Sequence, residues 1–458
     1  MKKAKPFLLS LFLTICCFSV HVHENVNSLL NDNNYIISND YLLVAVEYHK
    51  ENVSFVKRPV TTFLVEKIAS FSKIEIGEAF VTISFLFIFM NGVLMFFLAQ
   101  HFTKNNTLIV SNVILYFLCF SNLFAFFKPI YTYDEPVQFF FILLSLMTLL
   151  KNKKMLFVLI FSFSLIVRES GVILLPAMLI LAINKKERFI YTQYLSKEVI
   201  LKTLFFISPI LIYFIFLYFY SSHQNISKDL KSDFITRFSG LIFNFQSVKH
   251  SVETLISMFL ILGIPIYFLT NSLNTKNELF QTHKKYTRAF LITAIINSAI
   301  VISTTQARET RLFVIPMFFI WPIFVNLFLE DIKALFSLKN YTVIFKNWKS
   351  TCFFIFLNLM NFLISFKAFR STLGNDKDNY FNEYLFIIIL IIIIHSLIKR
   401  SRRISSIKDL NNLSPPNKPS IDLVSKSQAS RFSSRLHCLL SAKLLLCRKT
   451  ICKHTYFS

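Results

Sequence analysis

The feature that most constrains this chain is a series of long, unbroken apolar runs. Residues 79–102 and 108–127 are each long enough to cross the hydrocarbon of a bilayer as a helix, at about 1.5 Å per residue. Apolar residues in these runs are continuous and do not alternate with polar ones, so a transmembrane β-barrel is not predicted. Because backbone amides in hydrocarbon must pair within their own segment, the sequence predicts membrane-spanning α-helices.

Composition supports a membrane location and argues against a nucleic-acid partner. Hydrophobic residues make up 54% of the 458, and Phe alone numbers 55, which exceeds what one water-soluble core would bury. The net charge of +24 lies largely in short connections between apolar runs and in the C-terminal segment. Lys and Arg in such places set the orientation of helices in the membrane, so we do not expect nucleic acid to bind.

About twelve membrane passages are predicted, with both termini in the cytoplasm. They are expected at residues 7–22, 79–102, 108–127, 137–150, 155–167, 171–183, 203–220, 252–270, 287–304, 312–329, 351–366 and 383–398. Connections on alternate sides are rich in Lys, which is typical of cytoplasmic loops. We therefore predict an all-α, polytopic integral protein, and its abundant Lys, Asn, Ile and Phe favour a bacterial inner membrane.

The same pattern divides the chain into four parts. Residues 1–22 are expected to form a signal anchor that stays as the first transmembrane helix, and residues 23–78 an exported loop with juxtamembrane helices. Residues 79–398 are expected to form the transmembrane bundle. Residues 399–458 carry 13 Lys and Arg against two Asp, which predicts a basic, disordered cytoplasmic tail.

Arg168 separates two half-length apolar runs whose outer ends are both basic. Cytoplasmic retention of both basic ends predicts a hairpin, residues 155–183, with Arg168 at its exported tip. The alternative is one continuous helix with a charged centre, in which an unpaired Arg in hydrocarbon would cost several kcal/mol.

The exported first loop has a composition that favours helices. Leu64, Ile68, Phe71 and Ile74 follow helical spacing, which predicts an interfacial helix with its apolar side on the membrane. Such a helix would hold Asp40 near the bilayer surface, where a carboxylate can act as a general base toward a hydroxyl. The alternative role for Asp40 is to cap a helical turn that begins at residue 41.

Ionisable residues recur at the other predicted exported helix ends. Each adjacent pair, taken alone, can be a solvated or helix-capping pair. Their repetition on one side favours a substrate path, and converging guanidinium groups suit a phosphate, which they bind through two parallel hydrogen bonds. The residues are Arg58, Asp134, Glu135, Arg168, Glu169, Arg308, Glu309 and Arg311.

This layout resembles the GT-C superfamily of polytopic glycosyltransferases, which includes the dolichyl-phosphate-mannose and aminoarabinose transferase types. Asp40, Tyr41 and Ala45 resemble the acidic first-loop motif of that superfamily, and the FVKRP stretch at residues 55–59 is similar to its aromatic Arg-Pro segment. Residues 133–135 and 167–169 resemble its second acidic loop and its basic hairpin tip. The usual acidic pair is Asn39-Asp40 here, so the resemblance leaves open whether a divalent cation takes part.

The resemblance implies transfer of a sugar from a polyprenyl-phosphate donor, itself a membrane lipid, to an exported acceptor. Asp40 would then be the catalytic base, Asp134 and Glu135 would orient it or the acceptor, and Glu169 and Glu309 would support the site. The donor phosphate would bind Arg58, Arg168, Arg308 and Arg311. Alternative functions are a flippase or transporter of a lipid-linked or anionic solute, a glycan polymerase, and a catalytically inactive scaffold. A transporter would need charged groups that continue to the cytoplasmic face.

Overall fold

The structure, a computed structural model, describes residues 4–19, 39–123, 133–182, 197–223, 238–272, 283–346, 348–368 and 381–413. Helices make up 89% of these residues, and none of the residues described lies in a strand. The predicted all-α class is therefore confirmed for this part of the chain. The chain divides into two units, Met1–Lys399 and Arg400–Ser458, and the first contains the helical bundle.

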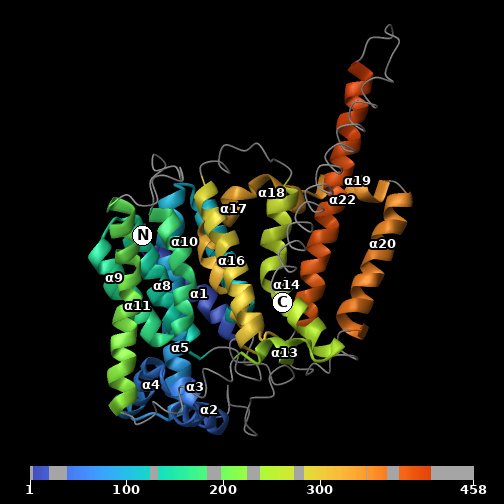
Figure 1. Ribbon diagram of the computed structural model, residues 1–458. Coiled ribbons are helices and arrows are strands. Elements are labelled where there is room, and N and C mark those ends of the chain that lie inside the picture. Colours follow the sequence, from blue (N-terminus) through green and yellow to red (C-terminus); the bar gives the residue numbers. More distant parts are fainter. Residues whose placement is uncertain are drawn as a thin grey trace, which may run out of the picture. The chain divides into compact units, whose positions relative to one another are not determined.

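The first half of the bundle unit starts with an apolar helix and a group of short helices, and continues into longer ones (Figure 1). The elements are α1 (Lys5–Ser19), α2 (Asn39–Glu51), α3 (Val53–Val56), α4 (Pro59–Ser72), α5 (Ile76–Phe102), α6 (Asn106–Phe117), α7 (Phe120–Leu123), α8 (Glu135–Leu150), α9 (Lys154–Val167), the 3-10 helix η2 (Glu169–Leu174) and α10 (Leu175–Ala182).

The second half alternates long helices with short, broken ones. The elements are α11 (Lys197–His223), α13 (Gly240–Phe245), α14 (Val248–Asn271), α16 (Lys284–Thr304), the 3-10 helices η4 (Thr310–Phe313), η5 (Ile315–Phe319) and η6 (Trp321–Ile323), α17 (Phe324–Leu327), α18 (Leu329–Phe336), α19 (Leu338–Lys346), α20 (Trp348–Phe362), the π-helix η7 (Leu363–Ala368) and α22 (Phe381–Leu413). Helix α22 continues past residue 398, where the bundle was predicted to end. Residues 414–458 of the predicted tail lie outside the described residues.

Several helices are suited to cross a membrane. Among the described residues, six helices are long and apolar enough by length and composition, and a bent pair, Thr310–Phe319 with Trp321–Leu327, makes a seventh if it counts as one span. Five shorter apolar helices of 10–17 residues, α1, α6, α8, α9 and the run Glu169–Ala182, coincide with the other predicted passages. The protein is thus an integral, multi-pass membrane protein, and the number of about twelve passages stays a prediction.

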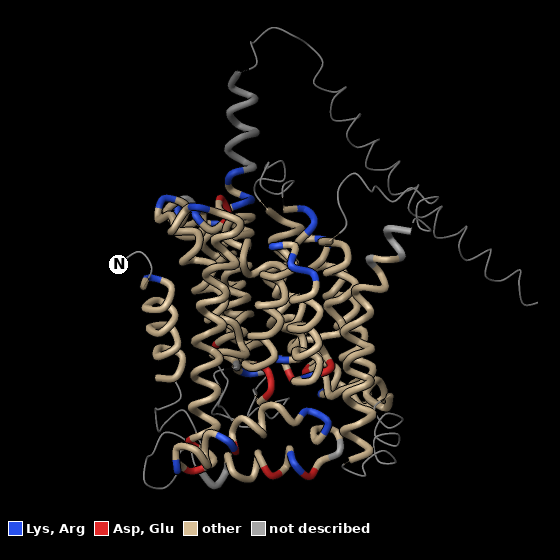
Figure 2. Tube along the Cα trace, turned by 90° about the vertical axis from the view of Figure 1, so that its left-hand side faces the viewer, with Lys and Arg blue, Asp and Glu red and all other residues tan. Residues whose placement is uncertain are grey.

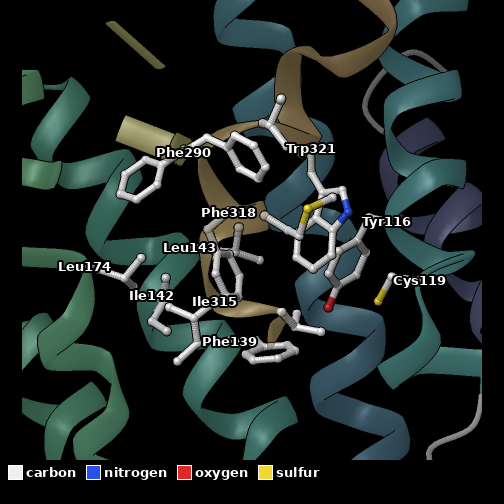
Figure 3. Packing of buried hydrophobic residues seen from close by; sticks show 14 of the residues in the cluster. Tyr116, Cys119, Phe139, Ile142, Leu143, Leu174, Phe290, Ile315, Phe318 and Trp321 are labelled. Atoms are coloured by element: carbon white, nitrogen blue, oxygen red, sulfur yellow. The ribbon is translucent and has the colours of Figure 1, made fainter. Parts of the chain in front are cut away.

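Aromatic side chains fill the centre of the bundle unit (Figure 3). Phe139 of α8 meets Phe318 of η5 edge to face, with ring centroids 4.9 Å apart, and Tyr116 of α6 meets Trp321 of η6 at 5.1 Å. Edge-to-face contact at this separation is a favoured arrangement of aromatic pairs. The broken segment of η5 and η6 therefore lies inside the bundle, against α6 and α8.

The predicted passage at residues 312–329 is not a simple helix. It is made of 3-10 turns and the short helix α17, and its two halves are bent by 51°. Pro316 and Pro322 each lie in a 3-10 element, and a proline ring removes a donor and clashes with the preceding helical turn. The break is accommodated because the segment is buried in protein, where other groups can satisfy its backbone.

Helices α2, α3 and α4 form a group at one end of the unit (Figure 1). Two residues of the predicted apolar face of α4, Leu64 and Ile68, are partly buried against a second core cluster, which contains the fully buried Val65 beside them. Phe71, predicted to face the membrane with them, is 91% exposed. The prediction of a juxtamembrane helix is thus corrected in its orientation, because α4 uses this face to contact the bundle.

Helices α18 and α19 lie at the opposite end (Figure 1). Lys and Arg gather at that end, as the coloured tube shows (Figure 2). Under the positive-inside tendency this would be the cytoplasmic end, and the side on which each end lies stays a prediction.

Candidate functional site

Charged residues from four distant segments meet where α4, α8, α9 and η4 begin or end. The segments are the α3–α4 junction, the start of α8, the junction of α9 with η2, and the start of η4. We call the group the charge network. Its members are Lys57, Arg58, Asp134, Glu135, Arg168, Glu169, Glu309 and Arg311.

Arg58 and Glu169 form the most regular pair of the network. Arg58 donates from Nε to Glu169 Oε2 at 2.7 Å and from Nη2 to Glu169 Oε1 at 2.6 Å. Lys57 Nζ lies 3.3 Å from the same carboxylate. Pro59 at the first position of α4 ends the preceding turn at Arg58, whose guanidinium also lies over the Phe55 ring. Two parallel charge-assisted hydrogen bonds fix both the distance and the orientation of this pair.

Glu135, the first residue of α8, joins two further arginines. It accepts a hydrogen bond from Arg168 Nη1 and lies 3.5 Å from Arg311 Nη1. Its other oxygen accepts from the backbone N–H of Tyr133 at 2.9 Å. Arg311 in turn donates to Glu309 at 2.8 Å. Glu135 is 4% exposed, so these partners replace nearly all of the water that a carboxylate would otherwise bind.

Arg168 lies at a break in the chain. Helix α9 ends at Val167, and Arg168 has extended backbone with φ −162° and ψ 122°. Gln138 of α8 holds this break through a hydrogen bond from its side-chain amide to the Arg168 carbonyl at 2.9 Å. One continuous helix through the charged centre, the alternative considered from the sequence, is therefore excluded.

Asp134 is the least satisfied carboxylate of the network. It is 1% exposed, its Oδ2 lies 3.9 Å from Arg58 Nη1, and its Oδ1 has no hydrogen-bond partner among the described residues. Burial raises its pKa from 3.8 to about 6, and the positive charges of Arg58 and Arg168 offset this only in part. A carboxylate with a pKa near neutrality and a free oxygen can accept a proton at physiological pH.

His49 of α2 lies next to the network and was not singled out from the sequence. Its ring stacks on Tyr133 at 3.5 Å between centroids and lies 4.4 Å from the Phe55 ring. Burial and the positive charge of Arg58 lower the pKa of His49 to about 3, so its ring is neutral at physiological pH. The sequence signal was weak, because one histidine in a polar stretch has no partner that spacing could reveal.

The network contains four cations and four carboxylates, and most of them already pair with each other. This differs from the expectation of arginines free to bind a phosphate. Glu309 is the most exposed of the paired acids, with 36% of its side chain accessible, against 26% for Glu169 and 5% for Glu135. Arg311 is therefore the guanidinium whose partner an incoming anion can most readily replace.

Seven of the nine predicted site residues belong to the network, namely Arg58, Asp134, Glu135, Arg168, Glu169, Glu309 and Arg311. Arg308 does not: it is exposed, donates to Gln306 at 3.1 Å and lies over the Phe243 ring. The structure therefore does not bring Arg308 together with the other arginines, and its role in binding phosphate stays a prediction. Asp40 lies in the first turn of α2, which begins at Asn39, and its side chain falls outside the described residues.

A second buried ionisable group, also missed from the sequence, lies near the other end of the bundle. Asp331 of α18 contacts His395 Nε2 of α22 at 2.8 Å and accepts a hydrogen bond from Ser272 at 2.8 Å. His395 Nδ1 lies 2.9 Å from the Tyr267 hydroxyl of α14. This group connects three helices and leaves Asp331 and His395 almost without exposure to solvent.

No family model, curated protein or solved structure matches this chain. Within the described ranges, no group of three or more His, Cys, Asp or Glu residues has the arrangement of a metal site. The function is therefore argued from the charge network, the membrane helices and the motif resemblance.

Proposed function

We propose that the protein is a membrane glycosyltransferase that moves a sugar from a polyprenyl-phosphate donor to an acceptor at the end of the bundle that carries the charge network. The observation that carries this proposal is the burial of a proton-accepting carboxylate, Asp134, beside paired guanidinium groups. Ionisable groups buried at the ends of membrane helices are costly, and they usually serve a substrate. The motif resemblance to GT-C enzymes points to the same chemistry.

In this proposal the carboxylates and the arginines have distinct roles. In this proposal Asp134 accepts the proton of the acceptor hydroxyl, whose oxygen attacks the anomeric carbon with inversion. The bond from that carbon to the phosphate oxygen breaks, and Arg311 exchanges Glu309 for the departing phosphate. Arg58, paired with partly buried Glu169, and Arg168, paired with buried Glu135, keep the site in shape. Asp40 is the base that the motif resemblance favours, and the experiment below distinguishes the two carboxylates.

An apolar cavity supports a lipid-linked donor. It has a volume of about 290 Å³ and lies among α6, α14, η5 and α22. Its walls include Ile264, Met317 and Ile388, and Met317 follows Arg311 by six residues. A hydrocarbon chain from the surrounding bilayer fits such a cavity better than water does, because its lining offers few polar partners.

The test uses purified protein in phosphatidylcholine vesicles with polyprenyl phosphate that carries a radiolabelled hexose, together with membranes of the source cell as acceptor. Release of polyprenyl phosphate and transfer of label are measured. Asp134→Asn should lower transfer by about 10²-fold or more if Asp134 is the base, with Asp40→Asn as its comparison. Arg311→Gln should show a similar loss, while Arg308→Gln, three residues away and outside the network, should retain activity. Unchanged transfer by both Asp variants contradicts an enzyme that uses either carboxylate.

A transporter of a lipid-linked anion is the second candidate. The observation that favours it is a second buried ionisable pair, Asp331 and His395, near the opposite end, since a transporter needs charged groups that continue toward both faces. The same vesicles distinguish the two functions. A transferase breaks the sugar–phosphate bond and releases polyprenyl phosphate, whereas a transporter moves the intact labelled lipid between leaflets, where a membrane-impermeant periodate reagent can detect it.

A further inference from the structure

Helices α18, α19 and the start of α20 present large apolar side chains away from the protein. Phe336 is 84% exposed, Leu338 81%, Trp348 77% and Phe345 51%. Lys339, Lys346 and Lys349 stand among them, and all three are exposed. We call these seven residues the elbow surface.

On its other side, the segment that carries the elbow surface packs against α22. Ala334 and Ile344 are buried in a small cluster with Leu397 and Ile398 of α22. Asn340 donates to the Ala334 carbonyl at 2.7 Å, and the Tyr341 hydroxyl donates to the Leu335 carbonyl at 2.6 Å. The exposed aromatic residues therefore face outward as part of a packed structure.

The elbow surface lies at the boundary of the bilayer, because the chain continues from it directly into a membrane helix. Trp348 is the first residue of a helix, Trp348–Lys367, that is apolar and long enough to span and only 11% buried in protein. Further along it, Ile355 and Phe356 are more than half exposed, so their side chains face lipid. Trp is typical of the region where a membrane helix enters the headgroups, and Lys can extend its ammonium toward them.

The positive charge of the elbow surface favours anionic lipid over neutral lipid. From Ile332 to Ala368 the sequence contains no Asp or Glu. The two acids that precede this stretch are occupied, since Glu330 pairs with Lys333 and Asp331 is buried against His395. The C-terminal segment 399–458 has 13 Lys and Arg against two Asp, so it has the wrong charge to cover this surface.

We propose that the elbow surface inserts its aromatic residues into the headgroup region of the bilayer and binds anionic phospholipid headgroups through Lys339, Lys346 and Lys349. Clustered Lys beside a membrane helix attracts anionic lipid, and the aromatic residues supply the apolar contact that holds the helix in the interface. This inference is independent of the proposed transferase activity.

The experiment uses the intrinsic fluorescence of the full-length protein. The chain has two tryptophans, of which Trp321 is 3% exposed, so Trp321→Phe leaves Trp348 as the only emitter. This variant is reconstituted in phosphatidylcholine and phosphatidylglycerol at a ratio of about three to one, with bromine on the acyl chains of one lipid or the other. We expect brominated phosphatidylglycerol to quench Trp348 about twofold more per mole than brominated phosphatidylcholine.

The controls separate a lipid-specific effect from a general one. Replacing Lys339, Lys346 and Lys349 together by Gln should equalise the two lipids, whereas the same change at Lys151, Lys153 and Lys154, in the exposed turn between α8 and α9, should leave the preference intact. The Trp348→Phe protein measures the quenching of Trp321, which lines the apolar cavity of the bundle, and that quenching should not change when the three elbow lysines are replaced. If both lipids quench Trp348 equally while the three elbow lysines are in place, the proposed preference for anionic lipid is wrong. If neither lipid quenches Trp348, water or a protein partner covers the surface, and the proposed insertion into the bilayer is wrong.

If Trp321→Phe does not fold, the lipid that co-purifies with the protein provides the readout. The wild-type protein, extracted in mild detergent, should retain a higher fraction of anionic phospholipid than the protein with the three elbow lysines replaced. An equal fraction in the two preparations counts against the proposal.

Discussion

At the scale of single residues, adjacent carboxylates differ because their partners differ. Glu135 is held by Arg168 and by the Tyr133 backbone, while Asp134 lies 3.9 Å from Arg58 and has one oxygen with no hydrogen-bond partner among the described residues. Burial without full compensation favours the neutral form of an acid. Asp134 is therefore the residue at which pH should change both stability and activity.

Replacing Asp134 by Asn should alter the pH dependence of stability. Because burial raises the pKa of Asp134 from 3.8 to about 6, the folded protein holds this proton more tightly than the unfolded chain. The stabilisation from the bound proton is complete below pH 4 and is lost as the pH rises through about 6, a change of roughly 3 kcal/mol. Thermal unfolding in detergent from pH 4 to 8 should show the variant gaining Tm over the wild type as pH rises, with a plateau above about pH 7. A pH-independent difference would contradict this.

Replacing Glu169 by Gln should destabilise the protein strongly. The change removes the charge that pairs most closely with Arg58, whose side chain is only 10% exposed, and leaves its guanidinium with the 3.9 Å contact to Asp134. Removing one partner of a fully buried ion pair lowers the free energy of unfolding by roughly 3 kcal/mol or more. The expected loss here lies at the low end, because Glu169 is partly accessible to water. Glu330→Gln is the matched control, since the exposed Glu330–Lys333 pair should contribute less than about 1 kcal/mol. Similar Tm values for the two variants in the same detergent would show that the Arg58 pair is not structural.

At the scale of elements, the short helix α13 positions the loop that carries the last part of the network. Asn244 of α13 donates to the carbonyls of Ile302 and Thr305 and accepts from the Ala307 N–H. These bonds fix the end of α16 and the turn that follows it as far as Ala307, four residues before Arg311. A change in the distance between α13 and α16 should therefore alter the site without any change to its charged residues.

Replacing Gly240 by Ala tests this spacing. A Cβ at Gly240 would lie 2.7 Å from the Thr305 nitrogen and 2.9 Å from the Ser303 oxygen, both backbone atoms that cannot move independently. We expect a loss of about 1–3 kcal/mol in the free energy of unfolding. Gly263→Ala is the control, because the nearest neighbours of its Cβ, at 2.7 Å, are atoms of the Phe259 ring of the same helix, a side chain that can turn away without moving the backbone, and Ala favours a helix interior. Equal unfolding temperatures for the two variants would show that α13 can separate from α16 at no cost.

At the scale of the whole molecule, the bundle unit has two unlike ends. One carries α2 to α4 beside the charge network, and the other carries α18 and α19 with an excess of Lys and Arg (Figures 1 and 2). The positive-inside tendency predicts that the second end is cytoplasmic. The orientation decides from which side an acceptor would reach Asp134.

Two single-cysteine proteins test the orientation. In a background without the seven native cysteines, Phe71→Cys and Lys153→Cys place exposed thiols on α4 and on the turn between α8 and α9. A membrane-impermeant maleimide should label Cys at 71 in intact cells and Cys at 153 only after the membrane is opened. Labelling of both positions from outside, or the reverse order, would contradict the predicted topology.

The sequence predicted the positions of the helices better than it predicted the contacts between them. The apolar runs located most helices, including the interruption at Arg168, because each run carries its own hydropathy. The breaks at Pro316 and Pro322 follow from the chemistry of proline, whereas their depth in the core depends on which helices surround them. His49 and Asp331 gave no sequence signal, because their partners, Tyr133 and His395, lie far away in the chain.

The sequence by itself determined that this is an integral membrane protein made of a bundle of helices. The free energy of transferring a helix to hydrocarbon is a sum over consecutive residues, so it can be read along the chain. Only the tertiary structure decided that Arg58 pairs with Glu169, 111 residues away, and that Arg308 stays apart while Arg311 joins the network. Ion pairing depends on distances of a few ångströms in space, and helix packing, not sequence spacing, sets those distances.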